Sequence, residues 1–225
     1  AILLNIGFMG TASVPLFAFI GAVATLFFVM YLSASGGGIS STNLILSGII
    51  VAAILSAGIS FLKYIADEQV AVIIFWLMGD LSSAEIRLVG ILAGMLLPCF
   101  VVIFWHSHAM NLLLMGKEMA QSTGLNIKVV TITLLVTSSF MVSATVSYCG
   151  LIGFVGLVMP HLLRLIFGPD HRVLVPACIL GGGAYLVICD LMARTLPEQG
   201  EMPAGVVTAL IGAPLFILLL KRSER

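Results

Sequence analysis

Charged residues are scarce in this chain. They make up 9% of its 225 residues, and ten basic side chains balance ten acidic ones, so the formal net charge is zero. A neutral chain exerts no bulk electrostatic attraction on nucleic acid, and no nucleic-acid partner is expected. The four cysteines form no Cys-x-x-Cys pair, which argues against a disulfide framework and against a zinc site. The sequence also lacks a P-loop, and no catalytic residues are predicted.

Apolar residues are abundant instead. Hydrophobic residues account for 60% of the chain, and its mean hydropathy is +1.20. A soluble domain of this length could not hide so much apolar surface, because its exterior must remain largely polar. A run of about 20 apolar residues is long enough to cross a bilayer. Seven such runs are predicted as membrane-spanning helices: Val14–Leu32, Leu44–Tyr64, Ile86–Trp105, Val129–Ser147, Leu151–Phe167, Val173–Ala193 and Ala204–Leu220.

The predicted fold is therefore all-α, a polytopic transmembrane helical bundle. Ala1–Met9 has the composition of the tail of a further membrane helix. Neither a linker nor a shift in composition marks a second domain, and residues 1–225 are expected to form a single transmembrane domain. The Leu151–Phe167 run is short and follows its predecessor almost directly, which predicts that part of it is buried inside the bundle.

Basic residues are distributed unequally between the connections. If the C-terminus lies in the cytoplasm, the inner segments hold Lys117, Lys128, Arg164, Arg172, Lys221, Arg222 and Arg225, and the outer segments hold Lys63, Arg87 and Arg194. The positive-inside rule favours this orientation. We therefore predict a multi-pass protein of the cytoplasmic (inner) membrane with a cytoplasmic C-terminus.

Glycine recurs at every third position at Gly150, Gly153 and Gly156. On a helix this spacing would leave one face bare and let another backbone approach closely. Pro160 removes a backbone hydrogen-bond donor and is expected to bend the segment just before His161. These five residues are therefore predicted to serve helix packing or gating. A tightly packed membrane hairpin without a gating role would show the same pattern.

Four segments resemble, in order, those of one transporter family. They are FWLMGDLSSAE (Phe75 to Glu85), MGKEMAQSTGLNIK (Met115 to Lys128), GLIGFVGLVMPHLLRLIFGPDHRVLVP (Gly150 to Pro176) and DLMARTLPEQGEMPAGVVTALIGAPLFILLLK (Asp190 to Lys221). On these segments the chain is identified as a member of the permease subunits of ABC importers for iron–siderophore complexes, haem and cobalamin, the FecCD/BtuC-like family. The resemblance implies a BtuC-like fold. It also implies that the family's first helices are missing here, so the domain is expected to be incomplete at its N-terminus.

The segment around Met115 to Lys128 mixes apolar, charged and small side chains. Gly124 is predicted to end a short helix as its C-terminal cap. By the resemblance, this inner segment docks into a groove on an ATPase. The residues assigned to this coupling are Leu114, Gly116, Lys117, Glu118, Ala120 and Gly124. A short amphipathic helix could instead lie at the lipid interface.

A second group of residues is expected on the outer side. Asp190 and Arg194 are four residues apart, so they can pair on one face of a helix. The resemblance implies that outer basic residues contact acidic residues of a substrate-binding protein. The residues assigned to this docking are Arg194, Glu198, Lys63 and Arg87. A plain surface ion pair between Asp190 and Arg194 is an equal alternative, because water reaches the end of a span.

The sequence thus predicts a permease that moves an iron(III)–siderophore or a related metal chelate, such as haem or cobalamin, by alternating access. The expected partners are a second permease subunit, identical or different, a pair of ABC ATPases, an extracytoplasmic substrate-binding protein and the lipid bilayer of a bacterium or archaeon. No metal or cofactor is expected on the chain itself, and ATP with Mg²⁺ would bind the ATPases. Two alternatives stay open: an ion-coupled secondary transporter, which would need ionisable residues near the membrane centre, and a nonfunctional truncated permease.

Overall fold

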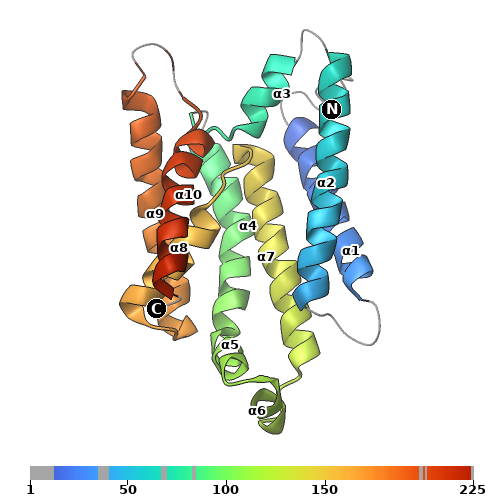
Figure 1. The fold of residues 1–225 in the computed structure, drawn as a ribbon, viewed down its shortest axis with the longest axis vertical. Coiled ribbons are helices and arrows are strands. Elements are labelled where there is room, and N and C mark those ends of the chain that lie inside the picture. Colours follow the sequence, from blue (N-terminus) through green and yellow to red (C-terminus); the bar gives the residue numbers. More distant parts are fainter. Residues whose placement is uncertain are drawn as a thin grey trace. The chain divides into compact units, whose positions relative to one another are not determined.

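The computed structural model describes residues 13–34, 41–66, 70–82, 85–197, 200 and 202–223. Within these ranges ten helices follow one another (Figure 1). They are α1 (Ser13–Ser33), α2 (Ser41–Ala66), α3 (Val70–Leu77), α4 (Ile86–Trp105), α5 (Ser107–Leu114), α6 (Lys117–Ser122), α7 (Ile127–Cys149), α8 (Val155–Phe167), α9 (His171–Thr195) and α10 (Ala204–Ser223). The predicted all-α class is confirmed.

Five of these helices are long and apolar enough to cross a membrane. They are α1, α2, α4, α7 and α9, and each contains or coincides with one of the predicted spans. Two shorter apolar helices accompany them, Val155–Phe167 and Ala204–Leu219. The prediction of a helical span over Leu151–Phe167 is wrong, because α8 begins only at Val155 and has 13 residues.

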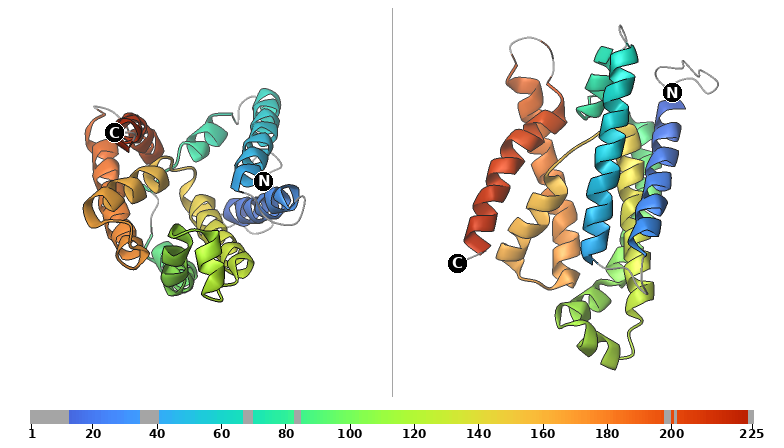
Figure 2. Two further views of the ribbon diagram at one scale, coloured as in Figure 1. Left: turned by 60° about the horizontal axis from the view of Figure 1, so that its bottom comes forward. Right: turned by 45° about the vertical axis from the view of Figure 1, so that its right-hand side comes forward.

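The chain divides into two compact units, and each is described by itself. Unit 1 comprises residues 1–74 and 128–148, and unit 2 comprises residues 75–127 and 149–225. In unit 1, α1 packs along α2 (Figure 2). The Ser33 hydroxyl donates to the Asn43 carbonyl at 3.4 Å, and the rings of Phe19 and Phe140 meet edge to face at 5.3 Å. Whether the whole chain acts as one domain stays a prediction.

In unit 2, α8, α9 and α10 pack against one another (Figure 1). One buried cluster joins Met159 and Leu163 of α8 to Leu174 of α9. The close approach of α8 and α9 depends on a small residue, since a Cβ on Gly181 would lie only 3.0 Å from Leu163 Cδ1. Between membrane helices, such close van der Waals packing over small residues favours association.

The segment before α8 is not helical, which corrects the prediction of a bare helix face. Gly150 has φ 70°, and Phe154, at the N-terminus of α8, adopts the left-handed conformation with φ 65°. Gly150 and Gly153 therefore precede α8, while Gly156 lies in its first turn. Only Gly150 is at a close backbone contact, because a Cβ there would overlap the carbonyl oxygen of Trp76. The three glycines do not share one helix face.

Pro160 and His161 lie inside α8, as predicted. The His161 ring meets Phe216 of α10 edge to face, with ring centroids 6.4 Å apart. Its Nε2 is buried, and among the described residues no polar atom is within hydrogen-bonding distance. The ring contact places His161 in the α8–α10 packing, and a gating role for Pro160 and His161 stays a prediction.

Candidate functional site

The predicted coupling segment forms two short helices at one end of unit 2. After α4, the chain continues almost directly into α5, and His106 stands between them. Met115 and Gly116 then form the turn into α6. Gly116 has φ 108° and ψ 153°, a conformation that side chains with a Cβ rarely adopt, so glycine is what permits this turn.

The C-terminus of α6 is closed by a complete glycine cap. Gly124 has φ 83°, and its N–H donates to the Gln121 carbonyl at 2.9 Å. The N–H of Leu125 donates to the Ala120 carbonyl at 3.2 Å. These two bonds are the Schellman pattern, which satisfies carbonyls that a helix end would otherwise leave without partners. The helix end predicted at Gly124 is therefore present.

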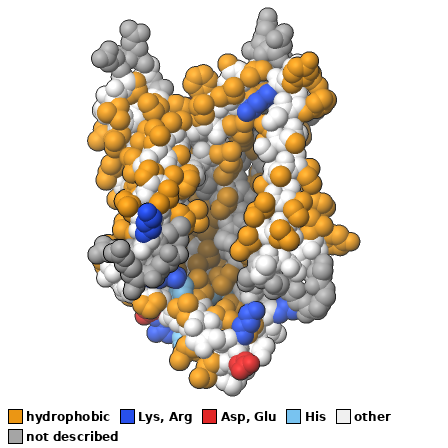
Figure 3. Space-filling view, in the orientation of Figure 1, with side chains coloured by type: hydrophobic (Ala, Val, Ile, Leu, Met, Phe, Trp, Pro, Cys, Tyr) orange, Lys and Arg blue, Asp and Glu red, His pale blue; other side chains and the backbone are white. Residues whose placement is uncertain are grey.

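The residues assigned to coupling present one open surface. Leu114, Met115 and Met119 are 54%, 66% and 53% exposed, and Lys117 and Glu118 are exposed beside them. A shallow hollow of about 640 Å³ lies over this surface, lined by Met115, Gly116, Lys117, Glu118, Met119 and Ser122. Charged side chains appear at the end of unit 2 that carries α5 and α6, whereas hydrophobic ones dominate the long helices (Figure 3). Apolar side chains mixed with opposite charges suit contact with another protein better than contact with water alone.

Ala120 is the exception among the assigned residues. It is fully buried and belongs to the opposite side of α6. It therefore supports the helix from within and cannot itself be part of an exposed docking surface. Its small size still matters, because α6 packs against α5.

A polar cluster fastens α5 to the start of α9. The Asn111 side-chain amide donates to Asp170 Oδ1 at 2.6 Å, and Asn111 Oδ1 accepts from the His171 N–H at 2.9 Å. His171 Nδ1 lies 2.8 Å from the same Asn111 oxygen, and Arg172 Nη2 lies 3.1 Å from Nδ1 of His108. Sequence reasoning did not identify this cluster, because Asn111 and Asp170 are 59 positions apart.

Asp170 is also the N-cap of α9. Its Oδ1 accepts from the Arg172 N–H at 2.9 Å. That backbone hydrogen bond, together with the one from the Asn111 amide, holds the pKa of the Asp170 carboxyl below its usual value. Both bonds favour the ionised form, since an ionised carboxylate is the stronger acceptor. An Asp immediately before a long apolar helix was the one sequence signal that could have identified this residue.

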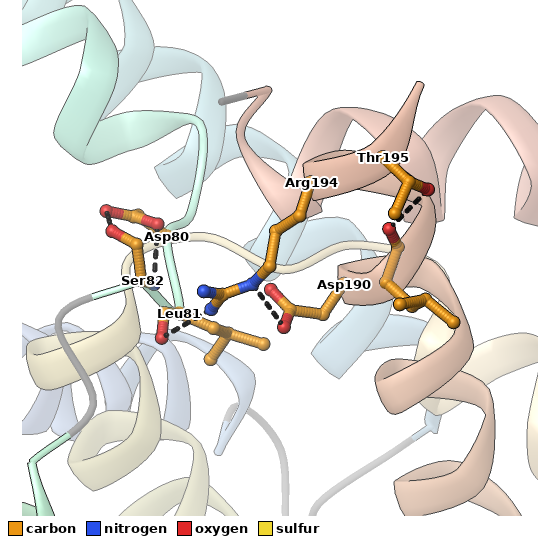
Figure 4. Close-up of polar contacts among 7 residues, drawn as sticks. Asp80, Leu81, Ser82, Asp190, Arg194 and Thr195 are labelled. Atoms are coloured by element: carbon orange, nitrogen blue, oxygen red, sulfur yellow. Dashed lines mark hydrogen bonds and ion pairs between the residues drawn. The ribbon is translucent and has the colours of Figure 1, made fainter. Parts of the chain in front are cut away.

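The other end of α9 carries the predicted ion pair. Arg194 Nε donates to Asp190 Oδ2 at 2.9 Å, and Arg194 Nη2 donates to the Leu81 carbonyl at 3.4 Å (Figure 4). The turn at Leu81 is itself closed by Asp80, whose carboxylate accepts from the N–H and the hydroxyl of Ser82. The Arg194 side chain is 40% exposed. The Arg194 guanidinium is thus hydrogen-bonded within its own chain and remains partly exposed to solvent.

The remaining residues assigned to binding-protein docking belong to different units or are not described. Arg87 is exposed in the first turn of α4, in unit 2, whereas Lys63 is in the last turn of α2, in unit 1. Glu198 lies outside the described residues. Arg194 contacts a neighbouring segment, at the Leu81 carbonyl.

Comparison with known proteins identifies the family. The model of the FecCD transport family matches residues 1–222. The chain belongs to the FecCD transport family. With five helices that could cross a membrane, it is a multi-pass membrane protein.

Individual relatives agree with this assignment. The chain is 37% identical to the hemin transport system permease protein HmuU of Yersinia pestis and 39% identical to the cobalamin import system permease protein BtuC of Halobacterium salinarum, each over 92% of this chain. It spans 62% and 56% of the length of those two proteins. A solved structure, described as an inward-facing conformation of a metal-chelate type ABC transporter, superposes with a TM-score of 0.80 at 30% identity. That match covers 98% of this chain and 77% of the other.

Proposed function

We propose that this chain is the permease subunit of an ATP-driven ABC importer that moves a metal chelate by alternating access. Hydrolysis of ATP, with its Mg²⁺, belongs to a separate ATPase. The observation that supports this proposal best is the surface of α6. A short helix closed by glycines at both ends exposes Met119, Lys117 and Glu118 while its inner side is buried at Ala120.

This geometry favours docking on a protein over lying on lipid. A helix of six residues presents too little apolar surface to bind a membrane interface strongly, since that binding grows with buried apolar area. The charged pair Lys117 and Glu118 lies among exposed methionines, whose flexible side chains adapt to a partner's groove. Movement of the ATPase would then displace α6 as a rigid body.

The proposed orientation places α5 and α6 in the cytoplasm. Within unit 2, Arg164 and Arg172 flank the turn between α8 and α9, and Arg172 contacts His108 of α5. Of the basic residues expected on the inner side, Arg164 and Arg172 therefore lie at the same end of unit 2 as α5 and α6. Arg194 lies at the far end of the 25-residue helix α9, which suits the outer side of the cytoplasmic membrane.

The proposed cargo is an iron(III)–siderophore, with haem and cobalamin as related chelates. Two relatives are named for hemin and cobalamin transport, and the similar structure is named for metal-chelate transport. The proposed assembly contains a second permease subunit, a pair of ATPases and an extracytoplasmic substrate-binding protein, for which Arg194 is the best-placed contact. This chain spans less than two thirds of those two relatives, and the whole assembly is therefore a proposal.

Site-specific cross-linking tests the docking surface directly. A photo-reactive amino acid is placed at Met119, and its matched control is placed at Leu180, which is 77% exposed on α9. In native membranes, the Met119 probe is expected to capture a protein with a P-loop, and the Leu180 probe is not. Equal capture at both positions, or none at Met119, would contradict the assignment. Ferric siderophore, haemin and cyanocobalamin are then tested separately for binding to the co-purified substrate-binding protein.

A further inference from the structure

The side chain of Asn111 links α5 to α9 through both its NH₂ and its oxygen, and we call this link the tie. The Asn111 amide can donate and accept at the same time. Its NH₂ donates to the Asp170 carboxylate, and its oxygen accepts from the first backbone N–H of α9, at His171. His171 is 8% exposed and Asn111 is half-buried, so water has limited access to these bonds. Asn111 thereby completes the N-terminal cap of a helix to which it does not belong.

No short covalent connection joins α5 to α9. α5 is joined covalently to α4 and α6, whereas α9 follows the turn after α8, dozens of residues later. The chain after α6 continues into α7, most of which belongs to unit 1. Within unit 2, the α5–α6 pair can therefore act on α9 only through contacts, and among the described residues its polar contacts with the start of α9 are made by Asn111 and His108.

The His108 and Asn111 contacts with α9 differ in strength. Arg172 and His108 are both exposed and share one bond at 3.1 Å. An exposed side-chain pair of this kind contributes little and is easily replaced by water. Asn111 instead makes two bonds to adjacent residues, one of them to a helix N–H that would otherwise lack an intrahelical partner. The firm connection is therefore the one at Asn111.

We propose that Asn111 is a positioning residue through which the ATPase-docking segment acts on α9. This inference rests on the function proposed above, because it takes α6 as the place where the ATPase binds. A displacement of α6 is passed to α5, and Asn111 carries it to the N-terminus of α9 by way of Asp170 and His171. α9 reaches the opposite end of unit 2 at Asp190 and Arg194, so the tie connects the two predicted docking sites.

The hydrogen-bond pattern suggests a test by removal. Asn111→Leu has a similar shape and carries no polar group, so both bonds of the tie are lost. In Asp170→Asn one oxygen can still accept from the Arg172 N–H and from the Asn111 amide, because both bonds end on the same atom, Oδ1, and asparagine is as good an N-cap as aspartate. The matched control His108→Ala removes the exposed contact with Arg172 and leaves the tie in place.

The measurement is hydrogen–deuterium exchange over residues 171–180 in the complete transporter with its ATPase. Nucleotide-free and ATP–vanadate-trapped samples are compared. Trapping is expected to change exchange in this segment of the unmodified protein. In Asn111→Leu that nucleotide-dependent change is expected to be lost while the ATPase stays bound and still hydrolyses ATP. In Asp170→Asn and in His108→Ala it is expected to be present.

The outcomes test the coupling role of Asn111 and the proposed function separately. If Asn111→Leu keeps the full nucleotide-dependent change, the coupling role of Asn111 is overturned. If His108→Ala is as impaired as Asn111→Leu, the loss does not come from the tie at Asn111, and the proposed role is also overturned. If the unmodified permease fails to bind an ATPase at all, the proposed function fails first and the inference fails with it. A merely structural cap would raise exchange equally with and without nucleotide.

Discussion

The backbone N–H of Gly205, in the first turn of α10, donates to the carbonyl of Gly79 at 3.4 Å. The approach leaves no room for a side chain at Gly205. A Cβ there would overlap the Met78 carbonyl oxygen and would lie 2.7 Å from that of Leu151. The start of α10, the turn after α3 and the extended segment before α8 thus meet backbone to backbone in unit 2.

We expect Gly205→Ala to destabilise the protein. Both clashes are with backbone oxygens, so relief requires the chain itself to shift, at a cost on the order of 1–3 kcal/mol. The matched control is Gly183→Ala in α9, where a Cβ would meet nothing within 4 Å. Alanine is expected there to be neutral or stabilising, because glycine is the poorer helix former.

Thermal unfolding in detergent separates the two variants. Cys189 is fully buried, so a thiol-reactive dye can report when the core around it opens once the half-buried Cys99, Cys149 and Cys178 have been replaced by alanine. Gly205→Ala is expected to lower the midpoint and Gly183→Ala is not. Equal midpoints for the two variants would show that the backbone around Gly205 can shift to accommodate a Cβ without loss of stability.

The long helices are the part of the fold that the sequence predicts well. The predicted span Ile86–Trp105 has the same bounds as α4, and the other four long helices agree within a few residues. The reason is physical, since each of these helices is specified by a continuous apolar run within its own segment. Long-range contacts are not needed to recognise them.

The segment around Gly150 shows where local patterns fail. Its glycines repeat at a helical spacing, yet Gly150 adopts a positive φ, and the carbonyl of Trp76 occupies the space that a Cβ would fill there. No pattern within the segment predicts a contact with residues some seventy positions earlier. The same holds for Asn111, which stands beside three leucines and finds its partners at Asp170 and His171. In both places the deciding interaction is non-local.

Replacing Gly124 by valine tests the docking helix. Gly124 has φ 83°, and a β-branched residue in that conformation is strained by about 1–3 kcal/mol. The cap formed by the N–H groups of Gly124 and Leu125 is expected to open, and α6 is expected to lose its fixed shape. ATPase binding should fall while membrane insertion is unaffected.

Co-purification of the ATPase with the tagged permease measures this effect. Gly94→Val is the control, since Gly94 lies inside α4, does not have a positive φ and has open space around a Cβ. Unchanged ATPase recovery with Gly124→Val would remove α6 from the docking site. Equal loss with Gly94→Val would point to general damage by valine.

The Asp170 cap predicts a dependence of stability on acid pH. Hydrogen bonds from the Arg172 N–H and the Asn111 amide lower the pKa of Asp170 in the folded protein below its usual value of 3.8. A group whose pKa is lowered by folding contributes stability above its unfolded pKa and loses it as pH falls through the folded pKa. Asp170→Asn cannot titrate. Its unfolding midpoint should therefore fall less than that of the unmodified protein between pH 5 and the acid limit of the assay, and parallel curves would contradict the cap.

Reversing the charge at Arg194 tests the outer docking site. Arg194→Glu removes the bond to Asp190 and puts two carboxylates together at the end of α9. If the guanidinium also meets an acidic residue of the substrate-binding protein, affinity for that protein should fall, mainly through a slower association rate. The effect on stability should be small, because an exposed ion pair contributes only about 0.2–1 kcal/mol.

A second variant distinguishes docking from the ion pair within the chain. Asp190→Arg combined with Arg194→Glu restores an ion pair at the same two positions with the charges exchanged. If Arg194 acts only by pairing with Asp190, the double variant should bind the substrate-binding protein as well as the unmodified permease. If Arg194 itself contacts the partner, binding should stay weak, because the positive charge has moved one turn along α9. Full recovery in surface-immobilised binding measurements would therefore assign Arg194 to the fold of the outer end and leave docking to other residues.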